Sequence, residues 1–403
     1  MNFEKLGNIA DLIAGQSPPS SSYNKNGIGV PFFQGKADYG EINPTIRNWC
    51  NEPTKISLPG DILISVRAPV GPVNINIVES CIGRGLSAIR VKENISRDYI
   101  YFYLKNNESK ISSLGVGSTF NAITQKDLKE IRIPLPTFPD QLHIANILTK
   151  AENLISKRKE SIRLLDEYLR CTFLEMFGDP SEMKKSKLEK LGDHITFLTS
   201  GSRGWAKYYS DKGAKFLRIQ NIWKGTMRTD DLQLVDVPST QEAIRTRVRE
   251  GDLLITITAD LGRTAVIPRN FGEAYINQHI VLVRLDNQID PIYAAYYYFM
   301  PFGHSAIQKK NKSAVKSGLA FDDIKNLPIF IPDKNLQTRF AQIVEKTESL
   351  KTHYQQSLKE LENLYGSLSQ RAFKGELSFK DEKLMIAAEP EVSYSKNAGA
   401  DQL

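Results

Sequence analysis

The chain contains an internal repeat, and each copy ends in a long amphipathic helix. In the first helix, apolar residues recur at every seventh position, at Leu148, Ile155, Ile162, Leu169 and Met176. A second series falls three residues after the first, at Ala151, Arg158, Leu165 and Thr172. This heptad spacing is typical of a coiled-coil seam, and a single helix cannot bury such a seam alone. The chain therefore needs a second helix as a partner for the first.

The second helix follows 196 residues later, where Gln337 stands in the place of Gln141. Its seam series is Val344, Lys351, Leu358, Tyr365 and Ala372. Each seam holds one basic residue, Arg158 in the first and Lys351 in the second, so we expect a specific pairing of the two helices. The alternative is a pair of unrelated amphipathic surface helices, and the repeat on either side of them argues against it.

The segments before the two helices repeat as well. The sequence GDILI at 60–64 returns as GDLLI at 251–255, and an aromatic-rich helix expected after Ser96 returns at Pro291. Thr124 with Asp127 is typical of a capping box that opens a short helix. The loops differ, since 17–23 reads SPPSSSY where 202–208 reads SRGWAKY. A shared frame with different polar loops is expected of two modules that read different targets, although simple drift of a duplicated domain leaves the same pattern.

The repeat divides the chain into five segments. We expect a first module over 1–138, a helix over 139–180, a second module over 181–332 and a second helix over 333–378. Residues 379–403 do not repeat and end in Ala/Ser/Asn/Gly-rich sequence, which predicts a disordered tail. Each module should be mixed α/β, because short β-type runs alternate with turns and helical patterns.

Composition adds little to this frame. The 403 residues are 41% hydrophobic, no apolar run approaches twenty residues, and the N-terminus lacks the layout of a signal peptide, so we expect a cytoplasmic protein. The net charge of +7 suggests an acidic partner such as nucleic acid, although many basic proteins bind none. Three widely spaced cysteines argue against a zinc site or a disulfide framework.

Catalytic motifs are absent from the sequence. A methyltransferase acting on adenine would need Asn/Asp-Pro-Pro-aromatic. The nearest segment is SPPS at 17–20, which has neither the Asn or Asp nor the aromatic residue. A phosphate-binding loop would need Gly-x-x-x-x-Gly-Lys-Ser/Thr, which Gly35-Lys36-Ala37 does not match. Glu182-Met183-Lys184 could end a nuclease motif but lies in a charged linker. His279, in Asn277-Gln278-His279, is either a polar loop residue near DNA or a satisfied histidine at the end of a strand. We therefore expect no catalytic and no metal-binding residues.

At this point the chain resembles the specificity subunit of type I restriction-modification systems. The motifs that carry the resemblance span nearly the whole chain, and their order matters more than any one of them. They are GDILISVRAPVGP at 60–72, IGRGL at 82–86, QKDL at 125–128, EMFGDP at 175–180, GSRGW at 201–205, FLRIQNI at 216–222 and AFKGEL at 372–377.

The resemblance implies a mixed α/β fold in which two target-recognition domains are separated by two long antiparallel coiled-coil helices. It also implies a non-catalytic subunit that reads a bipartite site in double-stranded DNA, one half-site per domain. The implied partners are two methyltransferase subunits and a restriction/translocase subunit, with no membrane. S-adenosylmethionine, ATP and magnesium would then bind those partners, and this chain would hold no cofactor. The rival readings are the recognition part of a fused methyltransferase-nuclease enzyme and a scaffold without DNA specificity.

Candidate DNA-binding residues follow from the chemistry of base edges. Arg or Lys suits guanine and Asn or Gln suits adenine. The candidates in the loops of the two modules are Gln34, Lys36, Arg67, Arg84, Arg203, Lys207, Arg218, Gln220, Asn221 and Arg263. A basic run suited to phosphates consists of Lys309, Lys310, Lys312 and Lys316. Each could instead be a solvated surface residue, and Tyr23 and Trp205 could stack on bases or pack in the core.

Overall fold

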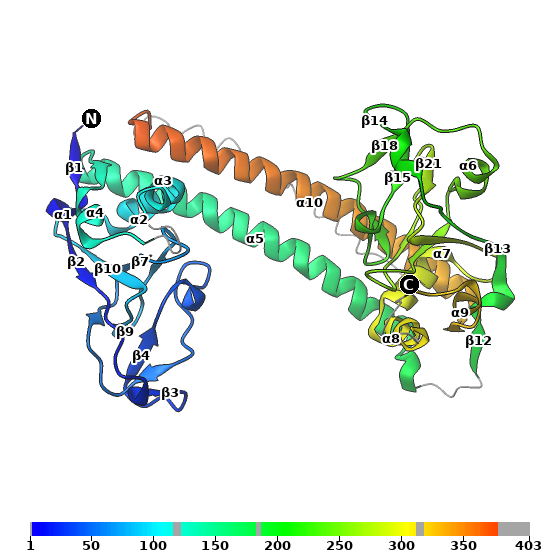
Figure 1. Ribbon diagram of the computed structural model, residues 1–403, viewed down its shortest axis with the longest axis horizontal. Coiled ribbons are helices and arrows are strands. Elements are labelled where there is room, and N and C mark those ends of the chain that lie inside the picture. Colours follow the sequence, from blue (N-terminus) through cyan, green and yellow to red (C-terminus); the bar gives the residue numbers. More distant parts are fainter. Residues whose placement is uncertain (1, 116–121, 183–186, 312–317, 378–403) are drawn as a thin grey trace, which may run out of the picture. The chain divides into compact units, whose positions relative to one another are not determined.

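The computed structural model describes residues 2–115, 122–182, 187–311 and 318–377, so the tail predicted at 379–403 lies outside the described residues. The chain divides into two units (Figure 1). Unit 1 takes in the residues up to Arg158 and those from Ser357 on, and unit 2 is Lys159–Gln356. None of the described helices combines the length and the apolar character that a bilayer span requires.

Unit 1 is built on an antiparallel sheet with the order β2-β10-β7-β8. These strands are β2 (Ala10–Ala14), β10 (Leu86–Val91), β7 (Ile62–Ser65) and β8 (Val73–Ile75). A second sheet has the order β3-β5-β4-β9-β6, in which β4 and β9 are parallel. Its strands are β3 (Tyr23–Asn24), β5 (Trp49–Cys50), β4 (Val30–Phe33), β9 (Ser80–Ile82) and β6 (Ile56–Ser57). β1 (Phe3–Lys5) pairs with β11 (Arg132–Pro134).

Unit 2 repeats this plan. Its main sheet has the order β13-β22-β19-β20, with β13 (Ile195–Ser200), β22 (Ile280–Leu285), β19 (Leu253–Thr256) and β20 (Thr264–Val266). Its second sheet has the order β14-β18-β15-β21, with β14 (Tyr209–Ser210), β18 (Gln233–Val235), β15 (Ala214–Leu217) and β21 (Ala274–Ile276). β15 and β21 are again parallel. The small pairs are β12 (Leu188–Lys190) with β23 (Pro328–Phe330) and β16 (Ile222–Trp223) with β17 (Thr226–Met227). The repeat predicted from the sequence is confirmed.

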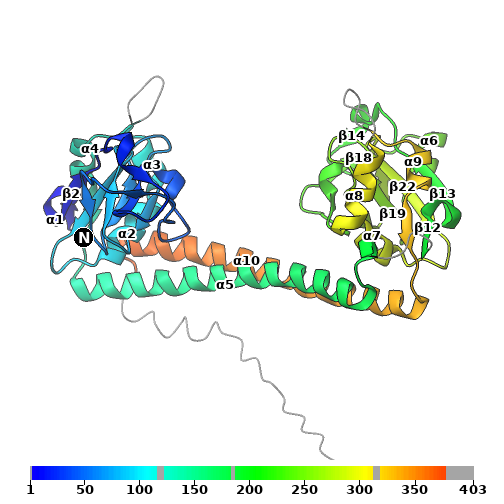
Figure 2. The same ribbon diagram turned by 90° about the horizontal axis from the view of Figure 1, so that it is seen from below.

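The main sheet is the middle layer of each unit. In β7, Ile62 and Ile64 pack into one core cluster and Leu63 packs into another, and all three are fully buried. Because successive side chains of a strand point to opposite faces, this strand must be covered on both sides. β19 does the same in unit 2, where Figure 2 shows α7 and α8 beside it.

Among the shorter helices, α2, α4 and α7 begin where the sequence predicts. In unit 1 the shorter helices are α1 (Leu6–Ile9), α2 (Arg97–Asn106), α3 (Glu108–Ser112) and α4 (Gln125–Glu130). Ser96 Oγ accepts a hydrogen bond from Tyr99 N at the start of α2, and Thr124 forms the predicted capping box with Asp127 at the start of α4. In unit 2 they are α6 (Gln241–Thr246), α7 (Pro291–Phe299), α8 (Pro301–Lys310) and α9 (Phe321–Lys325).

The two long helices are α5 (Phe138–Phe177) and α10 (Lys334–Lys374). In unit 1, Tyr365 donates its hydroxyl to Glu152 Oε1 at 2.8 Å. In unit 2, Lys351 binds Asp166, and Phe177 packs on Phe340 with ring centroids 5.5 Å apart. As the residue number on α5 increases from 152 to 177, the number of its partner on α10 decreases from 365 to 340, so the helices pair antiparallel, as predicted.

The Gly-Asp motif that marks the repeat comes directly before β7 in unit 1 and before β19 in unit 2, and its aspartate is buried. Gly60 has a φ of +92°, and the Asp61 carboxylate accepts from Leu58 N, from Arg90 Nε at 3.0 Å and from Arg90 Nη2 at 2.9 Å. Asp252 binds Arg249 N and Arg284 in the same way in unit 2. Burial raises the pKa of Asp252, and its hydrogen bond with Arg284 opposes this shift.

Candidate nucleic-acid interface

Strand directions bring four loops to one end of unit 1. β2 and β7 are both antiparallel to β10, so their C-terminal ends meet the N-terminal end of β10. β4 is parallel to β9, so the C-terminal ends of these two strands also lie together. Since β9 leads directly into β10, the loops after β2, β4, β7 and β9 gather at the same end of the sheet.

Main-chain contacts hold these loops against one another. The three-residue turn 83–85 joins β9 to β10 and accepts the end of β7 through Val66 N and Gly85 O, 2.9 Å apart. A Cβ on Gly15, in the loop after β2, would lie 2.1 Å from Gly83 O. The close approach of two backbones therefore requires a glycine at position 15.

The four candidates of the first module each follow one of these strands. Gln34 and Lys36 follow β4, Arg67 follows β7 and Arg84 follows β9, and all four are exposed. The buried Asp38 carboxylate accepts from Gln34 N at 2.7 Å and fixes the loop after β4 from inside. In the described part of the chain, no hydrogen bond or ion pair occupies the Arg67 or Arg84 guanidinium. The structure therefore brings the four predicted residues together as exposed side chains at one end of the sheet.

Unit 2 gathers the corresponding loops by the same strand directions. The turn 277–279 joins β21 to β22, and the loop after β13 reaches it through a bridge between Ser202 and Asn277. Arg203 and Lys207 in that loop are exposed. His279 Nδ1 bonds to Thr258 Oγ1, and its Nε2 lies 2.9 Å from Gln278 Nε2. His279 is therefore a satisfied histidine that also lies at the candidate interface.

The candidate residues after β15 in unit 2 are already bonded to other parts of the protein. Arg218 pairs with Asp231 at 3.2 Å, and Gln220 donates to the same carboxylate at 3.2 Å. Both would have to exchange this partner for DNA. The structure contradicts the prediction for Asn221, which is only 1% exposed. Its amide accepts from Arg218 N and donates to Arg228 O and Asp231 O, so it closes a turn and offers nothing to a base.

The remaining cations lie near the loop after β19. Arg263 pairs with Asp260 and stacks on Trp223, with 4.6 Å between its guanidinium carbon and the ring centroid. Gln308 Nε2 donates to Leu261 O at 3.0 Å, which ties the end of α8 to that loop. Lys309, which follows, is exposed and Lys310 is half-buried. Lys312 and Lys316 lie outside the described residues.

The two aromatic candidates belong to the core. Trp205 is 4% exposed, stacks on Phe216 with ring centroids 5.0 Å apart, and donates Nε1 to Glu242. Tyr23 is half-buried and stacks on Phe32 at 4.6 Å. Both side chains pack rather than stand free for a base.

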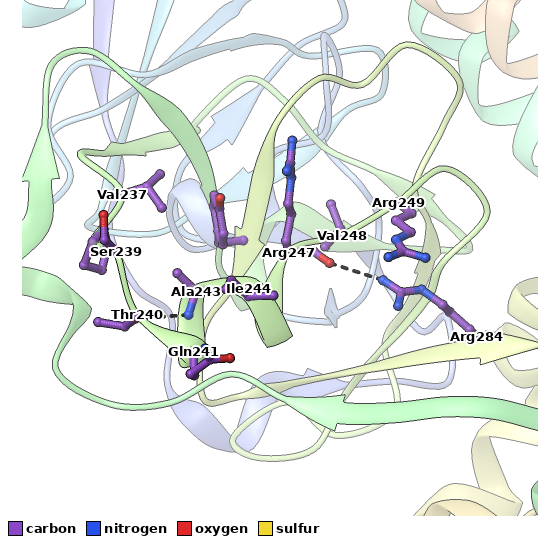
Figure 3. Close-up of a pocket in the computed structure, with 12 residues that line it drawn as sticks. Val237, Ser239, Thr240, Gln241, Ala243, Ile244, Arg247, Val248, Arg249 and Arg284 are labelled. Carbon is purple, nitrogen blue, oxygen red and sulfur yellow. Dashed lines mark hydrogen bonds between the residues drawn. The ribbon is translucent and has the colours of Figure 1, made fainter.

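A cavity of about 750 Å³ lies beside α6 in unit 2 (Figure 3). Arg284, which lines it, comes near the C-terminal end of β22, whereas the turn 277–279 stands at the N-terminal end of that strand. Arg284 is occupied by Asp252 and by Arg247 O, and the latter contact is dashed in Figure 3. The cavity is therefore separate from the gathered loops. Within the described ranges, no three His, Cys, Asp or Glu side chains come together to hold a metal.

Comparison with known proteins gives consistent matches. A family model described as "Type I restriction modification DNA specificity domain" matches residues 1–164 and 237–363. A Methanocaldococcus jannaschii protein named for the MjaX type I restriction enzyme specificity subunit is 52% identical over 151 residues, which are 37% of this chain and 36% of that relative. The MjaIX specificity subunit of the same organism is 21% identical over 94% of both chains.

Two further matches extend over most of the chain. The Escherichia coli EcoKI specificity subunit is 22% identical over 91% of this chain and 84% of its own. The crystal structure of a type I restriction-modification S subunit from M. genitalium shares the fold, with a TM-score of 0.62, 17% identity, and coverage of 92% of this chain and 96% of that one.

Proposed function

The chain belongs to the type I restriction modification DNA specificity domain family, and from this premise we propose that it reads a bipartite sequence in double-stranded DNA. Each unit would read one half-site with the loops gathered at one end of its main sheet. The chain itself would carry out no chemistry. It would dock two methyltransferase subunits and a restriction/translocase subunit, and these would hold S-adenosylmethionine, ATP and magnesium.

One observation carries this proposal: the main sheets of the two units have corresponding strand orders, but the same loops present different side chains. In unit 1 the loops after β4, β7 and β9 offer an exposed amide and two exposed guanidinium groups, from Gln34, Arg67 and Arg84. These groups present the paired donors and acceptors that base edges in the major groove require. A pure scaffold has no need of a constant frame with variable polar loops.

Phosphate contacts would supply affinity without sequence information. Lys309 and Lys310 at the end of α8 suit that role, since they lie next to the loop after β19. Specificity would then depend on the guanidinium and amide groups, and affinity on the lysines.

The proposal is tested by mapping methylated bases in the genome of a host with and without this gene, by long-read sequencing. We expect one bipartite motif, two fixed blocks with an unspecified spacer, to be methylated in the host and unmethylated after deletion. If the motif remained methylated after deletion of the gene, the proposal would be wrong. The full chain, purified with its methyltransferase partner, should select the same motif from a randomised duplex library.

A further inference from the structure

Two turns occupy the same place in the repeat, 83–85 in unit 1 and 277–279 in unit 2. The first joins β9 of the second sheet to β10 of the main sheet, and the second joins β21 to β22 in the same way. Four main-chain hydrogen bonds hold each turn, and they join corresponding residues. In unit 1 they are Gly15 N to Leu86 O (3.0 Å), Gly83 N to Phe33 O (2.8 Å), Val66 N to Gly85 O (2.9 Å) and Leu86 N to Gly83 O (2.9 Å). In unit 2 they are Gly201 N to Ile280 O (3.3 Å), Asn277 N to Leu217 O (3.1 Å), Ile257 N to His279 O (2.9 Å) and Ile280 N to Asn277 O (3.1 Å).

The glycine beneath each turn matches as well. A Cβ on Gly15 would lie 2.1 Å from Gly83 O, and a Cβ on Gly201 would lie 2.2 Å from Asn277 O. Both turns therefore rest directly on the backbone that leaves the edge strand of the main sheet. It follows that the middle residues, Arg84 and Gln278, stand at equivalent positions although the two turns share no residue type.

In unit 1 the packing leaves Arg84 as the only side chain of its turn. A Cβ on Gly85 would lie 2.5 Å from Gln34 O, and one on Gly83 would lie 3.1 Å from Gln34 Cα. The neighbouring loop thus fills the space that flanking side chains would need. Arg84 is exposed, and its side chain takes no part in the hydrogen bonds that hold the turn.

In unit 2 the flanking side chains hold the middle one in place. Asn277 Oδ1 accepts from His279 N at 3.1 Å, and Thr258 Oγ1 bonds to His279 Nδ1. The other ring nitrogen of His279 lies 2.9 Å from Gln278 Nε2. This contact uses one N–H of the Gln278 amide. The second N–H and Oε1 remain, and they are the donor and acceptor that adenine N7 and N6 pair with.

We infer that Arg84 and Gln278 are equivalent specificity-determining residues, and that Arg84 reads a guanine in one half-site while Gln278 reads an adenine in the other. The inference rests on the proposed function and names the base class at one position of each half-site. An arginine offers guanine O6 and N7 two parallel donors, whereas a glutamine offers adenine one donor and one acceptor. Because the main-chain hydrogen bonds of the two turns correspond, we expect each turn to accept the middle residue of the other.

The test is a reciprocal exchange in the full chain with its methyltransferase partner, using Arg84→Gln and Gln278→Arg. We expect Arg84→Gln to change one guanine of one half-site to adenine, and Gln278→Arg to change one adenine of the other half-site to guanine. Each preference should change by roughly 10- to 100-fold, and the untouched half-site should keep its sequence. The readout is the methylated motif together with selection from a randomised duplex library.

Matched controls carry the same chemical changes away from the gathered loops. Arg97→Gln at the start of α2 and Gln288→Arg, an exposed residue after the C-terminal end of β22, should leave both half-sites unaltered, and thermal unfolding should confirm that all variants fold. An unaltered motif in both exchange variants, with specific methylation retained, would overturn the inference while leaving the proposed function intact. Equal weakening on all sequences would identify phosphate contacts and would also overturn it. Absence of any sequence preference in the wild-type complex would instead overturn the proposed function.

Discussion

Lys351 Nζ lies 2.5 Å from Asp166 Oδ1, so the basic residue in the α10 seam meets a carboxylate from α5. The other oxygen of Asp166 binds Lys224 Nζ at 2.8 Å, and Lys351 also lies 3.3 Å from Glu348. Burial raises the pKa of Asp166, but its hydrogen bonds with the two lysines outweigh burial and the net shift is downward. The network joins both long helices to the β16–β17 hairpin within unit 2.

Removing either partner of this pair should destabilise unit 2. The Lys351 side chain is 13% exposed, so we expect Lys351→Met and Asp166→Asn each to lower the free energy of unfolding by about 1–3 kcal/mol. A double-mutant cycle in urea should give a coupling of about 1–2 kcal/mol. Additive losses would mean that the two residues contribute independently, and the pairing would then not be specific.

Arg67→Ala should relax recognition at one base of one half-site. A good bidentate contact contributes about 1–3 kcal/mol of discrimination, and the Arg67 guanidinium is exposed at the end of β7. Library selection with the purified complex measures the effect. Arg97→Ala is the control, since it makes the same charge change at the start of α2. If both variants lost affinity equally on every duplex, Arg67 would contact only phosphates.

Asn221→Ala should affect folding rather than base choice. The variant removes the side-chain partner of Arg218 N and Arg228 O and one of the donors to Asp231 O, so we expect a loss of about 1–3 kcal/mol in the free energy of unfolding. Gln220→Ala, at the exposed neighbour, should stay within about 0.5 kcal/mol of the wild type. A changed half-site with unchanged stability would reinstate Asn221 as a DNA-binding residue.

His194 should make unit 2 more stable at acidic than at basic pH. Burial lowers the pKa of His194, but hydrogen bonds to Glu189 and Asp286, both at 3.1 Å, raise it above its ordinary value of about 6.5. A raised pKa in the folded state stabilises the fold below about pH 6.5, and this contribution disappears as the pH rises through the folded-state value. The melting temperature of the wild type minus that of His194→Gln should therefore decrease as the pH rises from about 6.5 through the folded-state pKa of His194. A flat difference for His194→Gln across this pH range would refute the idea.

Gly15→Ala should be far more costly than Gly35→Ala. The new methyl group at position 15 would overlap Gly83 O, so the free energy of unfolding should fall by about 1–3 kcal/mol or more. Gly35 has a φ of −174° and nothing lies within 4 Å of a Cβ there, so alanine should be accepted within about 0.5 kcal/mol. Equal stability of the two variants in urea unfolding would contradict the close backbone approach beneath the turn.

The sequence predicted the parts of the fold that depend on long or local patterns. The heptad seams gave the two long helices, and the side chains of Ser96 and Thr124 marked helix starts because caps act within three residues. The second sheet was not predicted as a layer. Several of its strands, such as β3 and β5, are only two residues long, too short to show a period.

The candidate residues of unit 1 all lie exposed in the gathered loops, whereas one candidate of unit 2 is buried. The positions of Arg67 and Arg84 follow from the sequence because they come after apolar strands. Asn221 was misassigned because a polar residue in a loop has the same sequence signature whether its amide faces solvent or closes a turn. Gln278 was not singled out, since its equivalence to Arg84 is visible only in the main-chain hydrogen bonds of the two turns.

The turns at 83–85 and 277–279 have a consequence for how such a chain can diversify. Because the side chain of the middle residue takes no part in the four main-chain hydrogen bonds of each turn, a change of one codon there leaves those bonds in place. Lineages could therefore explore new target sequences one step at a time while keeping a folded intermediate at every step. Gly15 and Gly201 are too closely packed to accept another residue. Positions that can change and positions that cannot would therefore lie on adjacent loops at the same end of the sheet.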